Sequence, residues 1–337
     1  MKGLRYTALD GWRAIAILLV LCAHLLPLGR HAWGLNTSFG LAGMALFFCL
    51  SGFLVTDVLL DRPNILSFLI RRLFRILPLA WLYLLIVFFL KPMSFVDGLA
   101  HTFFYANYPP KPLIPMTDHL WSLCVELHFY LGLVLLVTLF RKYWMVLVPV
   151  LCVLITLLRI NNGMHYSVIT HFRVDEILIG GVLAMINRGV FISPEKSTLI
   201  KAYLSRLKFE WVLILFLVSC HIDSGFMNYF RPYLSAALIG TTLFAPHGKV
   251  HAVLSSRIML YLASISFAVY IIHPLLVHSW LGSGGIVEKY AKRPLLFVVL
   301  FLLAHGSTFY YEKRAIALGR KLSDWVSRKP SALASKS

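Results

Sequence analysis

Long runs of apolar residues recur along the chain and alternate with short segments rich in basic residues, proline and glycine. A helix needs about 20 mostly apolar residues to cross the hydrocarbon core of a bilayer, and most of the runs approach this length. The pattern therefore predicts an all-α fold, a polytopic transmembrane helical bundle. The ten predicted spans are residues 8–28, 39–60, 77–92, 119–140, 143–160, 172–188, 210–222, 232–246, 260–280 and 294–312.

The composition agrees with a membrane protein. Of the 337 residues, 59% are hydrophobic and only 14% are charged, and the mean hydropathy is +0.78. A soluble domain of this size needs far more polar surface. The first apolar run is longer than the core of a signal peptide and lacks a small-residue cleavage site. We therefore expect it to be a retained span of a multi-pass protein.

The formal net charge is +18, and the distribution of the basic residues predicts how the spans are oriented in the membrane. The basic residues cluster in loops between spans, which favours contact with anionic lipid headgroups and argues against nucleic acid as a partner. With the N-terminus inside, most Lys and Arg residues lie on the cytoplasmic side. Both termini are thus predicted to be cytoplasmic, with the inverted orientation as the alternative. Residues 1–321 are predicted to form one membrane domain, and 322–337 a mobile, basic cytoplasmic tail.

Two predicted loops have unusual compositions. Residues 64–78 mix apolar side chains with Arg71, Arg72 and Arg75, a pattern typical of a short amphipathic helix at the cytoplasmic interface. This helix could serve only as a headgroup anchor and topology signal. Residues 93–118 contain several prolines, so we expect an irregular loop that shapes an entrance.

The first span carries two ionisable residues, Arg13 and His24, eleven positions apart. At 100° and 1.5 Å per residue, both lie on one helix face, about 16 Å apart along the axis. Such a face is tolerated in a membrane only against the bundle interior or a water-filled cavity. The alternative is that Arg13 snorkels to the interface and His24 makes an interhelical hydrogen bond.

The fourth span adds a second polar face. Ser122, Glu126 and Tyr130 recur at four-residue intervals, and His119 lies on the same side. A carboxylate among apolar residues tends to be protonated or paired. We therefore expect Glu126 to have an intramembrane arginine or imidazole as its partner, either for chemistry or as a structural interhelical pair.

Later spans also contain ionisable residues. Arg173, Asp175 and Glu176 begin the sixth span, ahead of Gly180 and Gly181, where two backbones could approach closely. No span face carries two histidines at a metal-ligand spacing, so no metal is predicted. The remaining ionisable positions in the last two spans are His273, which precedes the helix-kinking Pro274, and His278, His305 and Glu312.

Six stretches occur in a fixed order: LDGWRAIAILLVLCAH (9–24), LFFCLSGFLVTDVLL (46–60), FLIRRLFRILPLAW (68–81), HLWSLCVELHFYL (119–131), ISFAVYIIHPLL (265–276) and FYYEKRAIALGRK (309–321). Together they resemble the acyltransferase-3 family of integral-membrane O-acyltransferases, the polysaccharide and lipid-linked glycan O-acetyltransferase type. The resemblance extends from residue 7 to about 321. It implies a multi-pass protein of the bacterial inner (cytoplasmic) membrane.

The resemblance also implies an activity. Such an enzyme moves an acyl group, usually acetyl, from cytoplasmic acetyl-CoA or another acyl-CoA to a hydroxyl of an extracytoplasmic or lipid-linked carbohydrate. The family motifs fall on Arg13 and His24, on Arg72 and Arg75 with Arg71 adjacent, on Trp121, Ser122, Glu126, Phe129 and Tyr130, and on Glu312. The chain departs from the family at His128, where glutamine is frequent, and at Lys313-Arg314.

The expected chemistry assigns roles to these residues. His24 would act as a general base or carry the acyl group itself, and these two routes stay open. Glu126 would orient His24, and Arg13 would hold phosphate, position the pantetheine arm or stabilise an oxyanion. Arg71, Arg72, Arg75 and Arg13 would bind the acyl-CoA. Substrate contact or support is expected from Ser122, Trp121, Tyr130, Asp118, His119, His273 and Glu312.

A secondary transporter is the alternative function. Intramembrane arginine, histidine and glutamate residues would serve equally well as a proton relay. The sequence has no inverted repeat or pair of broken helices, which are common in transporters. The enzyme hypothesis depends on one buried polar seam from Arg13 to His24 and Glu126.

Overall fold

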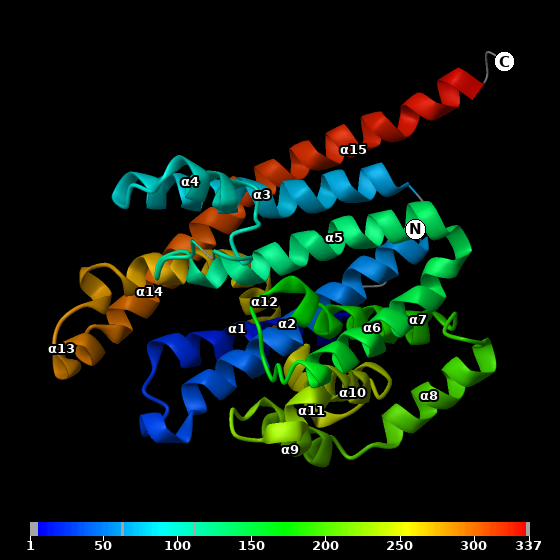
Figure 1. The fold of residues 1–337 in the computed structure, drawn as a ribbon, viewed down its shortest axis with the longest axis horizontal. Helices are drawn as coiled ribbons and strands as arrows, with labels where there is room; N and C mark the ends of the chain where they lie inside the picture. The colour runs from blue at the N-terminus through cyan, green and yellow to red at the C-terminus, as the bar shows by residue number, and fades with distance from the viewer. Residues whose placement is uncertain (1–5, 62–63, 111, 335–337) are drawn as a thin grey trace.

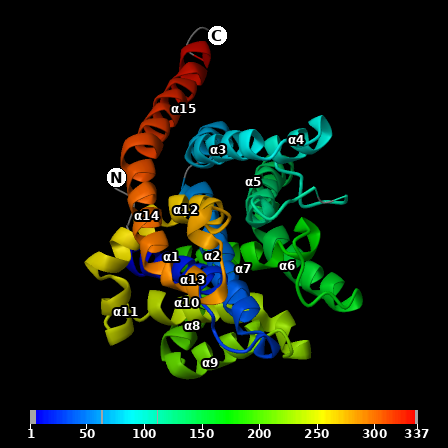
Figure 2. The same cartoon turned by 90° about the vertical axis from the view of Figure 1, so that its left-hand side faces the viewer.

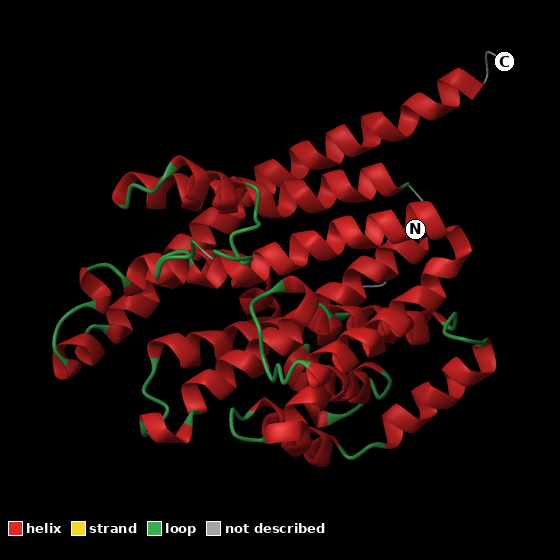
Figure 3. Cartoon of the chain, in the orientation of Figure 1, coloured by secondary structure: helices red, strands yellow, loops and turns green. Residues whose placement is uncertain are grey.

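The computed structural model describes residues 6–61, 64–110 and 112–334. Within these ranges all regular secondary structure is helical, which confirms the predicted all-α class (Figure 3). Each predicted span contains a helix. These helices are α1 (Thr7–Leu25), α2 (Leu35–Asp61), α3 (Ile65–Leu90), α5 (Trp121–Phe140), α6 (Trp144–Asn161), α7 (Asp175–Arg188), α9 (Phe209–Cys220), α10 (Arg231–Leu243), α12 (Arg257–Val277) and α14 (Arg293–Gly306).

The other α-helices connect or extend these ten. They are α4 (Phe95–Thr102), α8 (Pro194–Arg206), α11 (Lys249–Leu254), α13 (Ile286–Ala291) and α15 (Lys313–Ala334) (Figure 1). The last of them projects from the body of the molecule, far from α8, α9 and α11 (Figure 2). A π-helical turn, Ser307–Glu312, joins α14 to α15.

The length and apolarity of the helices support fewer spans than the sequence predicted. In the described part of the chain, six stretches could cross a membrane, and the pair α9 and α10, bent by 115°, could form a seventh. With 14 residues, α7 is about 21 Å long, shorter than a hydrocarbon core of about 30 Å. The count of ten and the cytoplasmic termini therefore stay predictions. The six stretches are Thr7–Leu25, Leu35–Asp61, Ile65–Leu90, Asp118–Asn161, Arg257–Val277 and Arg293–Ser327.

The predicted boundary between an interfacial helix and the third span is wrong. α3 runs without a break from Ile65 to Leu90, through Pro78. A proline removes one helical hydrogen bond, but the π-helical turn supports α3 at Pro78 and α15 supports it before Pro78. Tyr311 donates a hydrogen bond to the Pro78 carbonyl (3.1 Å), and Ser67 donates to the Ser323 carbonyl (3.0 Å).

α15 likewise crosses residue 322, the predicted start of the tail, without a break. On the far side of this boundary, Asp324 pairs with Arg71 on α3 at 2.7 Å. The division into a membrane domain and a tail stays a prediction.

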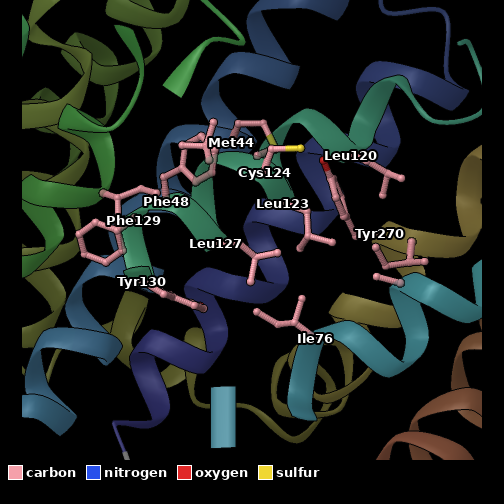
Figure 4. Packing of buried hydrophobic residues seen from close by; sticks show 14 of the residues in the cluster. Met44, Phe48, Ile76, Leu120, Leu123, Cys124, Leu127, Phe129, Tyr130 and Tyr270 are labelled. Atoms are coloured by element: carbon pink, nitrogen blue, oxygen red, sulfur yellow. The ribbon is translucent and has the colours of Figure 1, made fainter. Parts of the chain in front are cut away.

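The centre of the bundle is formed by α1 and α2, which pack against each other and against α12 and α7. Figure 4 shows how side chains from four helices meet there, with Phe48 from α2, Ile76 from α3, Leu127 from α5 and Tyr270 from α12. Because lipid tails are as apolar as these side chains, close packing holds such helices together more than water exclusion does. The packing fixes the helix faces that form the polar site.

The helices α2 and α7 approach each other closely, as the glycines in the sixth span predicted. A Cβ atom at Gly180 would lie 1.9 Å from the carbonyl oxygen of Cys49, and one at Gly52 would lie 1.8 Å from that of Ile177. Both distances are far inside van der Waals contact. Only glycine allows the two backbones to touch at these points.

Substituting Gly180→Ala is therefore expected to reduce the yield of folded protein. The new methyl group would meet backbone, which cannot rotate away as a side chain can, and overpacking of this kind costs about 1–3 kcal/mol or more. Gly132→Ala is the matched control, because a Cβ at Gly132 meets nothing within 4 Å. The fraction of monodisperse protein in detergent measures the effect. Equal fractions for the two variants would contradict the prediction.

Candidate functional site

Two large cavities open at opposite ends of α1. The first, of about 550 Å³, is lined by Arg13 and by residues of α2, α3, α7 and α15; we call it the Arg13 cavity. The second, of about 560 Å³, is lined by His24, by the loop before α5 and by the end of α12; we call it the His24 cavity. Since Arg13 and His24 share one face of α1, this face runs between the two cavities.

The Arg13 cavity is strongly basic. Six arginines of the described ranges line it: Arg13, Arg71, Arg72, Arg75, Arg188 and Arg320. Three of the six have carboxylate partners: Arg13 pairs with Asp10, Arg71 with Asp324, and Arg188 with both Asp57 and Asp61.

The other three arginines keep most of their hydrogen-bond donors available. Arg72 donates to the Leu54 carbonyl (3.2 Å) and lies 5.9 Å from the ring centre of Tyr130. Arg75 and Arg320 have neither a hydrogen bond nor an ion pair with any described residue, and both are exposed. Unpaired guanidinium groups around one cavity suit the oxygens of a phosphate.

A narrow seam continues from Arg13 into the bundle. A cavity of about 40 Å³ is lined by Arg13, Arg72 and Glu126, and one of about 10 Å³ lies along α1 between Arg13 and Tyr270. The smaller cavity has at most the room that one water needs. Phe47 lines both, so an extended ligand arm would have to displace such side chains to pass.

Glu126 lies on the Arg13 side of this seam. It accepts hydrogen bonds from the hydroxyls of Ser51 and Tyr130. Among the described residues these are its hydrogen-bond donors, so the expectation that Glu126 contacts and orients His24 is wrong. The reason is that Glu126 lies one helical turn, about 6 Å, past Ser122 on the same face of α5, where it meets Ser51 of α2 instead of His24.

The partner of His24 is another imidazole. His24 Nδ1 lies 2.8 Å from Nε2 of His273, and the two rings stack with centres 5.1 Å apart. His273 is 1% exposed, whereas His24 is exposed in its cavity. His119 packs edge-on against His273, and Asp118 lines the same cavity. The structure thus brings together four residues that the sequence proposed separately.

The remaining predicted site residues lie behind the His24 cavity or outside both cavities. Ser122 hydrogen-bonds to the Tyr270 hydroxyl at 2.6 Å, behind the His24 cavity. Trp121 lies outside both cavities, with the guanidinium of Arg173 5.3 Å from its ring centre. Glu312 accepts from Ser307 and Thr308 in the π-helical turn and is absent from the cavity linings.

Sequence reasoning missed two of the arginines in the Arg13 cavity, Arg188 and Arg320. Arg188 ends α7, and its partners Asp57 and Asp61 are spaced by one helical turn near the end of α2. That acidic pair beside a predicted span was the available signal. Arg320 had none, because only the packing of α15 against α3 brings it to the cavity.

Comparisons with known proteins found a matching family model and several similar curated proteins. The family model of the acyltransferase-3 domain, described as an acyltransferase domain, matches residues 6–311. A Staphylococcus aureus (strain COL) protein provisionally named an O-acetyltransferase is 28% identical over 85% of this chain and 53% of its own length. The Listeria monocytogenes peptidoglycan O-acetyltransferase is 24% identical over 79% of this chain and 48% of its own length.

A Bacillus subtilis (strain 168) protein provisionally named a peptidoglycan O-acetyltransferase is 26% identical over 80% of this chain and 48% of its own length. The chain thus spans about half the length of the curated relatives it matches. No solved structure matches it.

Proposed function

Because the chain belongs to the acyltransferase-3 family, we propose that it is an O-acetyltransferase. It transfers acetyl from acetyl-CoA, or an acyl group from another acyl-CoA, to a hydroxyl of a carbohydrate. One observation carries this proposal: a basic cavity and a histidine-lined cavity lie at the two ends of the α1 face that carries Arg13 and His24. Family membership favours this function over the transporter alternative.

The donor binds in the Arg13 cavity. Coenzyme A is a polyphosphate nucleotide with an extended pantetheine arm, and unpaired arginines suit its phosphates. Arg72, Arg75 and Arg320 supply guanidinium groups for them, while the arm follows the face of α1 from Arg13 past Ile17. We propose that this donor site is on the cytoplasmic side of a protein that has ten spans and both termini inside.

The acceptor hydroxyl binds in the His24 cavity. His24 takes the hydroxyl proton as a new C–O bond forms at the thioester carbonyl; the C–S bond then breaks, and the coenzyme A thiolate takes up a proton. In the other route, His24 attacks the thioester first and passes the acyl group on. Arg13, with Glu126 beside it, holds the pantetheine arm, because it lies about 16 Å along α1 from His24 and so does not reach the reacting carbonyl.

The acceptor is a glycan or a lipid-linked saccharide. Two relatives carry the name of peptidoglycan O-acetyltransferases, which supports a cell-envelope glycan. Membrane lipids surround the protein, which we place in the bacterial inner membrane. Within the described residues no group of histidine, cysteine and acidic side chains could hold a metal ion, and the chemistry above uses none.

Radiolabelled acetyl-CoA tests the proposed function. Purified protein in nanodiscs is incubated with labelled acetyl-CoA and cell-envelope glycan fragments, and both free thiol and acetylated glycan are measured. We expect both products to appear together and to depend on the glycan. Solute flux by the same protein in proteoliposomes, without thioester consumption, would overturn the proposal in favour of transport.

Substituting Arg75→Ala is expected to raise the KM for acetyl-CoA by about 10- to 100-fold, the range typical of a lost hydrogen bond to a charged group. Turnover at saturation should change little, because Arg75 lies away from the reacting carbonyl. Arg257→Ala is the control, since Arg257 is an exposed arginine outside the cavity lining. Equal KM values for the two variants would contradict donor binding by Arg75 and favour the alternative that residues 64–78 are a headgroup anchor.

A further inference from the structure

We propose that His273 is a positioning residue that sets which ring nitrogen of His24 carries the proton. The inference rests on the proposed acyl transfer, because it concerns the nitrogen that performs it. The residues involved are His273 and Pro274 in α12 and His24, whose side chain lines the His24 cavity.

Pro274 leaves one backbone carbonyl of α12 without its helical partner. In an α-helix the carbonyl of residue i accepts from the N–H of residue i+4, so the Tyr270 carbonyl would accept from residue 274. Proline has no N–H. The Nδ1 atom of His273 lies 2.7 Å from the Tyr270 carbonyl oxygen and takes the place of the missing donor. Since a carbonyl only accepts, Nδ1 of His273 carries a hydrogen.

The protonation of His273 determines that of His24. A neutral imidazole carries one N–H, so Nε2 of His273 is an acceptor. His24 Nδ1, at 2.8 Å from this acceptor, must therefore donate, and Nε2 of His24 keeps its lone pair. His273 is nearly fully buried, where a neutral ring is favoured over a charged one.

The lone pair on Nε2 of His24 is what either route of transfer requires. As a general base, Nε2 removes the proton of the acceptor hydroxyl; as an acyl carrier, Nε2 attacks the thioester carbonyl. In both cases the ring becomes positively charged, and its Nδ1–H bond to His273 strengthens because a charged donor bonds more strongly. His273 thus does for His24 what the aspartate does for the histidine of a serine hydrolase.

Two substitutions separate this role from packing. His273→Gln keeps an amide oxygen near the position of Nε2 and so keeps an acceptor for His24. His273→Asn keeps a donor near the position of Nδ1, toward the Tyr270 carbonyl, but its amide does not reach His24. We expect His273→Asn to lower kcat by about 10- to 100-fold with little change in KM for acetyl-CoA. His273→Gln should keep kcat within about tenfold of the unmodified protein and above that of His273→Asn.

Nitrogen-15 NMR of histidine-labelled protein in nanodiscs gives a readout that is independent of turnover. Comparison with His24→Ala identifies the signals of His24, which should show a protonated Nδ1 and an unprotonated Nε2. In His273→Asn this pattern should be lost. A proton on Nε2 of His24, or equal kcat for His273→Asn and the unmodified protein, would overturn the proposal. If the expected pattern is seen but no acetyl is transferred, the proposed function fails and the proton arrangement stands.

Discussion

Replacing His24 by alanine is expected to lower the turnover of acetyl transfer by about 10²- to 10⁴-fold, the range typical of a lost general base. The side chain lies at the end of α1, is exposed to its cavity, and has one hydrogen bond, to His273. Its removal therefore takes away the reacting nitrogen and little packing. Thiol release from acetyl-CoA in nanodiscs measures the effect.

A matched histidine separates this loss from a general effect on folding. His31 is exposed in the loop between α1 and α2, near the same end of α1. His31→Ala should therefore transfer acetyl at the rate of the unmodified protein. Both variants should elute as monodisperse protein in detergent. Transfer at the normal rate by a well-folded His24→Ala protein would remove His24 from the mechanism.

The positions of the helices could be predicted from the sequence because the signal for a membrane-spanning helix lies within its own residues. An apolar run of sufficient length identifies it, with no knowledge of its neighbours. The continuous helix from Ile65 to Leu90 could not be predicted in this way, because Pro78 is a signal that usually interrupts a helix. What continues the helix is contact with α15, whose residues lie about 250 positions further along the chain. Tertiary contacts of this kind are not visible in a single sequence.

In the candidate site too, some features could be predicted from the sequence and others depend on tertiary packing. Helical periodicity alone placed Arg13 and His24 on one face of α1, because both belong to one regular element. Periodicity could not identify the partner of His24, because His273 lies on another helix, α12, and only the packing of the helices brings the two side chains together. Glu126 was assigned to the wrong end of the seam for the same reason. Its neighbours Ser51 and Tyr130 depend on how α2 meets α5.

Breaking one buried ion pair is expected to have the largest effect on stability. Asp175 at the start of α7 pairs with Arg159 of α6 at 2.5 Å, and both side chains are fully buried. Asp175→Ala would leave the guanidinium of Arg159 with the carbonyls of Met164 and His165 and the ring of Tyr229, and with no carboxylate bonded to it among the described residues. An uncompensated buried charge costs about 3–5 kcal/mol. The variant should lose its monodisperse form in detergent at a markedly lower temperature than the unmodified protein.

An exposed pair provides the control for this effect. Asp324 pairs with Arg71 at 2.7 Å, almost the same distance, but its side chain is 57% exposed. Water replaces such a partner, so Asp324→Ala should cost only about 0–1 kcal/mol. The difference between the two variants therefore measures desolvation rather than the pairing itself. If both lose the same stability, water reaches Arg159, and the network at the start of α7 is not the rigid support that holds α6 and α7 beside the site.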